Sequence, residues 1–239
     1  MKPKMKHGTS IMMRAVRLDE MLYQDYLQQH YHGSPLGTKR KLSEILGVNN
    51  WAGQRCFVIG GGASLRDFDF SLLENELTIG VNKIYRVFEP TILFFADRIM
   101  YDEIEPLKTK SIKVAVDYTN ACFDGVYYVR SAGTKGVGMD IDNLYTGNNS
   151  GFGALNLALV LGAEPIYLLG FDYIPINGKY HVTDDWGMIQ AREYQDLLDG
   201  FKQEFQVISQ HVDTKVINLS PQSALECWPK MRIKEVFDG

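Results

Sequence analysis

The sequence contains few cysteines and shows no paired spacing among them. Only 3 cysteines occur in 239 residues, and they stand far apart at Cys56, Cys122 and Cys227. Structural zinc sites and disulfide frameworks need closely paired or regularly spaced cysteines, so the sequence excludes both classes. This use of cysteine is typical of a reducing compartment, and we expect a cytoplasmic protein.

A long apolar segment is also missing near the N-terminus. The chain starts with basic residues, but Arg14, Arg17 and Asp19 interrupt the apolar residues that follow. Neither the apolar core of a signal peptide nor a membrane-spanning helix can be drawn through such a segment. We therefore expect a soluble protein without a membrane span.

The sequence has no excess of positive charge. Its formal net charge is -4 at pH 7, and its 45% hydrophobic and 23% charged residues are ordinary globular values. A protein that coats nucleic acid would carry a basic excess, so nucleic acid is disfavoured as a partner. The length allows one large α/β domain with an appendage. The sequence is compatible with a homo-oligomer as well as with a monomer.

Two regions of the chain differ in their apolar pattern. Residues 1–50 place apolar side chains at helical spacing, with glycine stop signals at Gly33 and Gly47, and predict a helical N-terminal extension. Over residues 51–239 short apolar runs alternate with helical stretches, which predicts a mostly parallel, Rossmann-like sheet with helices on both faces. The predicted strands are CFVIG, LTIGVN, TILFFAD, SIKVAV, VYYV, PIYLLGFD and KVINLS, and the predicted helices cover 66–75, 98–106, 150–162 and 186–206.

Polar residues and glycines follow most of the predicted strands. They are Gly60, Gly61 and Gly62 after the first strand, then Asn82, Asp97, Asp172, and Asn218 with Ser220 after later ones. The carboxyl ends of parallel strands lie along one edge of a sheet, and ligands bind in the crevice there. The alternative is that Asn, Asp and Gly simply form the turns. The recurrence at five strand ends favours a shared site.

The segment CFVIGGGASL has the strand, glycine turn and helix order that phosphate binding requires. Gly60, Gly61 and Gly62 would let the backbone approach a phosphate, and Ser64 would cap the helix or donate its hydroxyl. A glycine turn can equally be a sharp corner. Leu65 replaces the last glycine of the dinucleotide fingerprint, and no Gly-Lys-Ser/Thr follows, so NAD and a P-loop ATPase are disfavoured.

A second candidate is the start of the helix predicted in TGNNSGFGALNLALVLG. Its interior is apolar on nearly every face and predicts a buried core helix. Its first turn is the functional candidate, because free N–H groups at a helix N-terminus can bind an anion or a ribose. The residues of this candidate are Thr146, Asn149, Ser150 and Gly151.

The loop DYIPINGKYHVTDDW follows a predicted strand end and contains His181. A histidine at the carboxyl edge can serve as a general base near neutral pH, although a loop histidine can also be merely solvated. Aspartates at the same edge, Asp97 and Asp172 among them, could hold magnesium together with phosphate oxygens. No spacing rule supports a metal here, and no firm cofactor is predicted.

Four segments together resemble a known superfamily: VIGGGASLRDFDFSLLENELTIGVNKIY, TGNNSG, LGAEPIYLLGFDY and INLSPQSAL. They are similar to the bacterial lipo-oligosaccharide sialyltransferases and to the related 6-hydroxymethylpterin diphosphokinase-like proteins, some of which occur in phages. The resemblance covers about residues 56–230 and implies a nucleotide-binding sheet of glycosyltransferase type. It implies a bacterial or phage protein.

The resemblance also implies roles for individual residues. Asn82 matches an asparagine of the donor phosphate region, and Ser150 with Gly151 matches a nucleotide cradle. The segment from Gly170 to Asp172 matches the one beneath the ribose and base, and His181 lies near the base histidine. Gly61 departs from the pattern, because it stands where the sialyltransferases carry a donor-binding asparagine.

The implied activity is a glycosyltransferase that takes a nucleotide-sugar donor and a small-molecule or glycan acceptor. Two alternatives stay open. One is a magnesium-dependent diphosphokinase that acts on a hydroxymethylpterin-like alcohol, with Asp97 or Asp172 as metal ligands. The other is a catalytically idle nucleotide-binding or assembly protein, which the loss of the turn asparagine favours.

Overall fold

The computed structural model describes residues 38–97, 100, 103, 109–117, 122–184 and 191–237. The chain divides into two compact units, residues 1–38 with 119–122 and residues 39–118 with 123–239. The first unit lies almost wholly outside the described residues. Most of the helix predicted at 98–106 and the start of the helix predicted at 186–206 also lie outside them. The helical extension predicted over residues 1–50 therefore stays a prediction for residues 1–37, and so does the domain boundary at 50/51.

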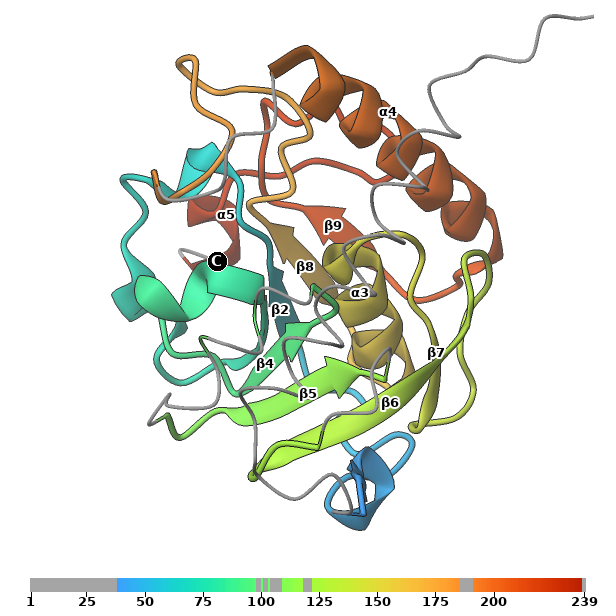
Figure 1. Ribbon diagram of the computed structural model, residues 1–239. Helices are drawn as coiled ribbons and strands as arrows, with labels where there is room; N and C mark the ends of the chain where they lie inside the picture. Colours follow the sequence, from blue (N-terminus) through green and yellow to red (C-terminus); the bar gives the residue numbers. More distant parts are fainter. Residues whose placement is uncertain are drawn as a thin grey trace, which may run out of the picture. The chain divides into compact units, whose positions relative to one another are not determined.

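The second unit is built on a nine-stranded sheet (Figure 1). All strand pairs in it are parallel, with the order β1-β6-β5-β4-β3-β2-β8-β9, and β7 pairs with β6. The strands are β1 (Arg40–Lys41), β2 (Cys56–Ile59), β3 (Leu77–Val81), β4 (Ile92–Phe95), β5 (Ile112–Val116), β6 (Val126–Gly133), β7 (Asn143–Tyr145), β8 (Ile166–Leu169) and β9 (Val216–Asn218). The described α-helices are α3 (Ser150–Val160), α4 (Ala191–Ile208) and α5 (Lys234–Phe237).

All seven predicted strands are confirmed, and the fold is the predicted parallel α/β sheet. β1 and β7 are additional and are 2 and 3 residues long. Two predicted helices are replaced by shorter structure. The segment expected at 66–75 forms the 3₁₀ helices Ala63–Leu65 and Phe70–Leu73, because the Asp69 side chain accepts from Ser71 N and starts a new turn. The segment that ends at Gly47 forms β1 and the 3₁₀ helix Leu42–Glu44.

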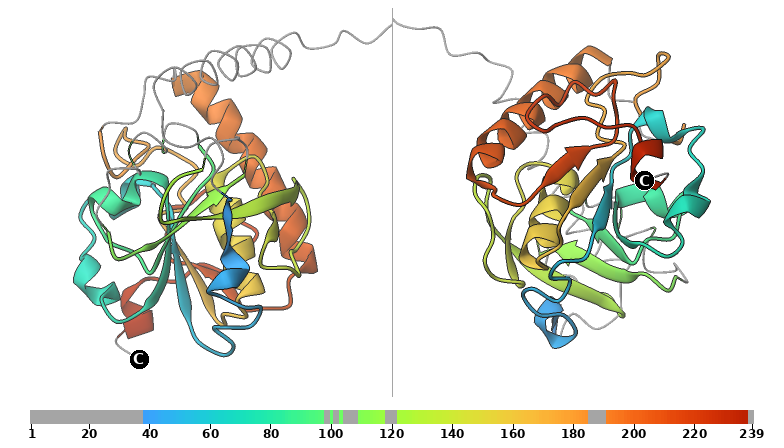
Figure 2. Two further views of the ribbon diagram at one scale, coloured as in Figure 1. Left: turned by 60° about the horizontal axis from the view of Figure 1, so that its bottom comes forward. Right: turned by 180° about the vertical axis from the view of Figure 1, so that it is seen from behind.

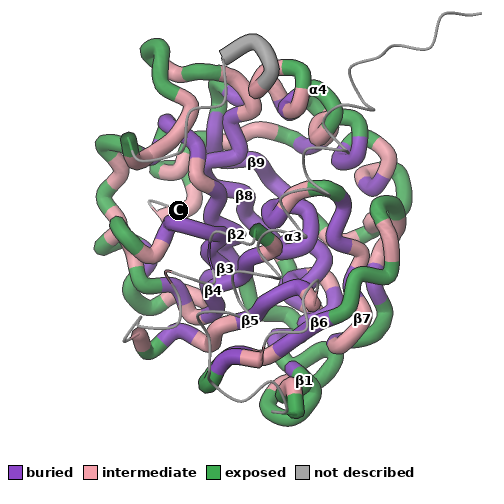
Figure 3. The backbone as a smooth tube through the Cα atoms, in the orientation of Figure 1, coloured by how far each residue is buried: buried purple, intermediate pink, exposed green. Residues whose placement is uncertain are grey.

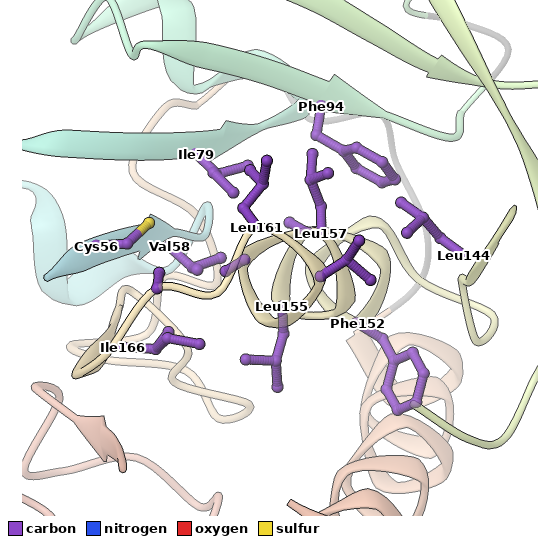
Figure 4. Close-up of a cluster of buried hydrophobic side chains, with 14 of the residues drawn as sticks. Cys56, Val58, Ile79, Phe94, Leu144, Phe152, Leu155, Leu157, Leu161 and Ile166 are labelled. Atoms are coloured by element: carbon purple, nitrogen blue, oxygen red, sulfur yellow. The ribbon is translucent and has the colours of Figure 1, made fainter. Parts of the chain in front are cut away.

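Both faces of the sheet are covered, and for this reason β2, β4 and β8 consist of buried hydrophobic residues at every position. In β2, Val58 packs in the cluster that contains Leu155 and Leu157 of α3, and Figure 4 shows α3 lying among these side chains. Phe57 points to the opposite face, where its ring stacks on Phe237 of α5 at 5.6 Å. Figure 2 shows helical segments on the two sides of the sheet, and Figure 3 shows the buried strands at the centre.

The order of the strands places a topological switch point between β2 and β8. From β2 the chain moves outward through β3, β4, β5 and β6, and then returns through α3 to β8 on the other side of β2. In open parallel sheets such a reversal leaves a crevice outside the carboxyl ends of the two central strands. Here those ends are the glycine turn after β2 and the segment Gly170–Tyr173 after β8.

Within the described part of the chain, no helix combines the length and apolar character that crossing a membrane requires.

Candidate functional site

A cavity of about 590 Å³ opens at the switch point, at the carboxyl edge of the sheet. Its volume falls within the range of small-molecule sites. Segments far apart in sequence line it: the glycine turn, the ends of β3 and β4, the first turn of α3, the loop after β8, and α4. Eleven of the residues predicted from sequence lie on its wall, namely Gly60, Gly61, Gly62, Asn82, Asp97, Asn149, Ser150, Gly151, Gly170, Asp172 and His181.

Two predicted residues do not line this cavity. Thr146 is buried beside β6, where its Oγ1 lies 2.6 Å from Ser131 Oγ and its N–H donates to Gly133 O. Ser64 is not among the lining residues, and its Oγ donates to Asp172 Oδ1 at 2.6 Å and lies 3.4 Å from Ser220 Oγ. The structure therefore brings together the central part of the predicted site and leaves these two hydroxyls outside it.

The glycine turn after β2 is packed directly against the loop after β8. Gly60 N donates to Leu169 O at 2.7 Å and Gly62 N donates to Gly170 O at 2.9 Å. A Cβ atom at Gly62 would overlap both Gly170 O and the Asp172 carboxylate, so the backbone approach leaves no room for a side chain. At positions 60 and 62 glycine is thus required by the neighbouring loop.

An aspartate of the chain occupies the donors that were expected to bind phosphate at this turn. Asp172 Oδ2 accepts from Ser64 N at 2.8 Å, and Asp172 Oδ1 accepts from Ser64 Oγ at 2.6 Å. Asp172 is 2% exposed, so this carboxylate is a fixed part of the turn. Of the turn amides, that of Gly61 has no hydrogen-bond partner among the described residues, and Gly61 lines the cavity.

Asn82 and Asp97 form a polar pair on the cavity wall. Asn82 Nδ2 donates to Asp97 Oδ2 at 2.5 Å, and Ser150 also hydrogen-bonds to Asp97. Burial raises the pKa of Asp97, and the hydrogen bonds from Asn82 and Ser150 oppose that rise. Asp97 is nevertheless an exposed residue that lines the cavity.

Asn82 carries two unusual features at the end of β3. Its backbone has φ of 50°, in the left-handed region that non-glycine residues rarely adopt. Its side-chain Oδ1 is buried without a hydrogen-bond partner among the described residues. An unsatisfied buried acceptor and a strained backbone both cost free energy, and such features concentrate at functional sites.

The first turn of α3 is fixed by a cap and by a buried glutamate. Asn149 caps the helix, because its Oδ1 accepts from Phe152 N at 2.8 Å. Glu204 of α4 is 9% exposed and accepts from Asn148 N and from the side-chain amides of Asn148 and Asn149. These contacts hold Asn149, Ser150 and Gly151 at the cavity.

His181 lies on the cavity wall in the loop after β8. Residues 62 and 181 form an antiparallel bridge, and Val182 N donates to Gly61 O at 2.9 Å, so this loop is joined to the glycine turn. Burial lowers the pKa of His181 to about 4, aided by the nearby Arg66 and opposed by a hydrogen bond with the Gly61 backbone. The imidazole is therefore neutral at physiological pH, which is the form that accepts a proton.

The mouth of the cavity contains two cations and one carboxylate. Arg66 donates to His181 O at 2.8 Å and to Asp184 Oδ1 at 2.7 Å, and Lys179 Nζ lies 3.0 Å from the same oxygen. These ion pairs and hydrogen bonds lower the pKa of Asp184 to about 2. Asp184 is thus ionised, and this cluster carries an excess of one positive charge.

The cavity also has an apolar and aromatic wall. It includes Tyr173 and Tyr180 of the loop after β8, and Tyr194, Leu198 and Phe201 of α4. The rings of Tyr194 and His181 are 5.2 Å apart, and those of Tyr194 and Tyr180 are 5.0 Å apart. This wall was not predicted from the sequence, although Tyr194, Leu198, Phe201 and Phe205 have the spacing of one helix face.

The two aspartates considered as magnesium ligands do not form a metal site in the described structure. Both carboxylate oxygens of Asp172 accept hydrogen bonds from Ser64, and one of Asp97 accepts from Asn82. Among the described residues, no group of three or more His, Cys, Asp or Glu side chains is placed to hold a metal ion.

Comparison with known proteins shows similarity of fold at low sequence identity. No protein-family model matches the sequence, and no curated protein matches it. Among solved structures, the MAf glycosyltransferase from Magnetospirillum magneticum AMB-1 matches with a TM-score of 0.52 and 14% identity, over 78% of this chain and 35% of that one. This chain thus spans about a third of the length of that glycosyltransferase.

Two further matches are sialyltransferases. The sialyltransferase CstII from Campylobacter jejuni, in complex with cytidine-5'-monophosphate, gives a TM-score of 0.48 and 15% identity over 75% of this chain and 85% of that one. A mammalian sialyltransferase gives 0.37 and 12% identity over 62% and 65%. The expected Rossmann-like fold of glycosyltransferase type is confirmed by the match to MAf glycosyltransferase, and the similarity to diphosphokinases stays a prediction.

Proposed function

We propose that the protein is a glycosyltransferase that takes a nucleotide-sugar donor, with His181 as the general base. The observation that carries this proposal is the position of His181: a neutral imidazole on the wall of a cavity that lies at the topological switch point of the sheet. A base with a lowered pKa in a cleft is a functional candidate with a physical reason. The fold shared with MAf glycosyltransferase supports the reaction class only at the level of fold.

The proposed reaction is a direct displacement at the anomeric carbon of the donor. His181 accepts the proton of an acceptor hydroxyl while the acceptor oxygen forms its bond to that carbon. The bond between the carbon and the donor phosphate oxygen breaks, and its electron pair leaves with the nucleotide. The Gly61 amide and the positive excess of the Arg66 cluster lie near His181 and would stabilise the leaving phosphate.

Our proposal gives Asn82 a different role from the one that the resemblance implied. Its side-chain amide donates to Asp97, and Asp97 also takes a hydrogen bond from Ser150 at the start of α3. A phosphate placed beside this carboxylate would be repelled. In our proposal the donor phosphate therefore lies at the mouth of the cavity and not beside Asn82.

The reaction can be tested without knowing the acceptor, because glycosyltransferases can transfer slowly to water. We expect the wild-type chain to release nucleotide from at least one donor in a panel of CMP-, UDP-, GDP- and TDP-sugars. The variant His181→Gln should lower this rate by about 10² or more, since general-base catalysis contributes about 10²–10⁴. The matched control is His211→Gln, at an exposed histidine outside the cavity.

Two results would contradict the proposal. One is release of nucleotide at the same rate by wild type and His181→Gln, with both chains folded by circular dichroism. The other is failure of the wild-type chain to act on any donor of the panel in the presence of simple sugars as acceptors. An idle nucleotide-binding protein would give the second result while still binding nucleotides.

A further inference from the structure

The cavity wall carries two polar clusters of opposite character on different segments of the chain, and this restricts how a ligand can lie in it. The first, here called the Asp97 end, is Asp97 with Asn82 and presents acceptors, while at the second Arg66 and Lys179 outnumber Asp184. Tyr180, Tyr194 and Phe201 line the same cavity. A ligand that carries both an anionic group and hydrogen-bond donors would match the two clusters in only one orientation.

The Asp97 end is suited to hydrogen-bond donors. One carboxylate oxygen of Asp97 accepts from Asn82, and the side chain as a whole is exposed to the cavity, so it has further acceptor capacity. Asn82 is 7% exposed and lines the same cavity with an unpartnered Oδ1. Among the described lining residues, the cations Arg66 and Lys179 both pair with Asp184, and no contact joins either of them to Asp97.

We propose that Asp97, held by Asn82 and Ser150, binds a vicinal diol of the ligand and thereby orients it with its phosphate toward Arg66 and Lys179. A diol supplies two hydroxyl donors at the spacing of a carboxylate, and charge-assisted hydrogen bonds of this kind are strong. The proposal rests on the proposed function and specifies the donor orientation within it. The diol can come from the ribose of the nucleotide or from the transferred sugar.

The ribose source is tested by calorimetric titration of the full chain with ribonucleoside monophosphates of C, U, A and G, and with their 2′,3′-dideoxy counterparts. For the nucleotide that binds wild type, we expect the dideoxy form to bind at least about tenfold more weakly, because a charged acceptor loses its partners. In Asp97→Ala the two forms should bind within about twofold of each other. Asp97→Asn, which keeps the shape and one acceptor, should give an intermediate ratio.

The matched control places the same substitution at the second cluster. Asp184→Ala removes a carboxylate from the mouth, so it should strengthen phosphate binding and leave the ratio between ribo and dideoxy forms unchanged. The transferred-sugar source is tested by ligand-observed NMR with methyl galactoside and methyl glucoside at millimolar concentration, on wild type and Asp97→Ala. Binding of a glycoside that Asp97→Ala loses would identify the sugar as the source.

The outcomes separate this proposal from the proposed function. Equal binding of ribo and dideoxy forms, together with glycoside binding that Asp97→Ala does not change, overturns the diol site and leaves nucleotide-sugar use standing. If no nucleotide binds wild type, nucleotide-sugar use fails, and the diol site stands only on glycoside binding that depends on Asp97. If, in addition, glycoside binding does not depend on Asp97, both the diol site and nucleotide-sugar use are overturned.

Discussion

At the scale of single residues, two aspartates decide the chemistry of the cavity. Asp172 accepts from Ser64 N and Oγ, and Asp97 accepts from Asn82 and Ser150. Each carboxylate therefore stands where the sequence pattern suggested a bound phosphate. Glycine turns and helix N-termini attract anions of any kind, including side chains of the same protein. The pattern predicted an anion at this edge of the sheet, and in the structure side-chain carboxylates of the protein take these hydrogen bonds.

His181 gives a prediction about stability at low pH. Its pKa is lowered to about 4 in the folded protein from an ordinary 6.5, mainly by burial. Between these values the unfolded chain binds a proton that the folded chain does not, so stability falls as pH decreases from 6.5 to 4. Allowing for the partial exposure of His181, we expect this group to contribute about 1–2 kcal/mol of that loss.

Urea unfolding of wild type and His181→Gln at pH 7.5 and pH 4.5 measures this contribution. The variant should lose less free energy of unfolding than wild type over this interval, because it lacks the group that titrates. An equal loss in both chains would show that the imidazole is not held neutral by its surroundings.

At the scale of elements, the contact between the glycine turn and the loop after β8 positions the site. The backbone N–H groups of residues 60 and 62 donate to carbonyl oxygens at the end of β8. In the loop that contains His181, Val182 N donates to Gly61 O. The three segments are thus joined at the switch point without a large side chain between them. Short backbone contacts of this kind leave no tolerance for an added Cβ atom.

Two Gly→Ala substitutions compare a position where an added Cβ atom would overlap its neighbours with a position where it would have free space. Gly62→Ala would place a methyl group against Gly170 O and Asp172, and we expect it to destabilise the protein by about 2 kcal/mol or more. Gly200→Ala lies inside α4 with no atom within 4 Å of the new Cβ, and should stabilise by about 0.5–1 kcal/mol. Thermal or urea unfolding of both variants gives the comparison. A Gly62→Ala variant as stable as wild type would contradict the packing described here.

At the scale of the whole molecule, the sheet and the strand-end residues along its carboxyl edge could be predicted from the sequence. Strands such as β2 and β8 are buried on both faces, so they appear as continuous apolar runs bounded by turn residues. The same property placed Asn82, Asp97 and Asp172 at one edge. β1 and β7 could not be found, because 2 and 3 residues carry too little pattern to identify a strand.

The parts of the site that escaped prediction depend on contacts between distant segments. The pairing of Asp172 with Ser64 joins residues 108 positions apart, and Glu204 reaches Asn149 across 55. The spacing along α4 showed an apolar face, but nothing in the sequence states whether such a face meets the core or a cavity. Conversely, Thr146 precedes α3 in the sequence and was predicted at the site, but its hydroxyl contacts Ser131 of β6.

The most direct test of the central claim, that this cavity binds a nucleotide, is a thermal-shift series with CMP, CDP, UDP, ATP and GTP, each with and without magnesium. Our account predicts stabilisation by a cytidine or uridine nucleotide that does not depend on the metal, of about 2.7 kcal/mol at a hundredfold excess over the dissociation constant. A purine shift that requires magnesium would favour the diphosphokinase alternative. No shift with any of the five would contradict the nucleotide site itself.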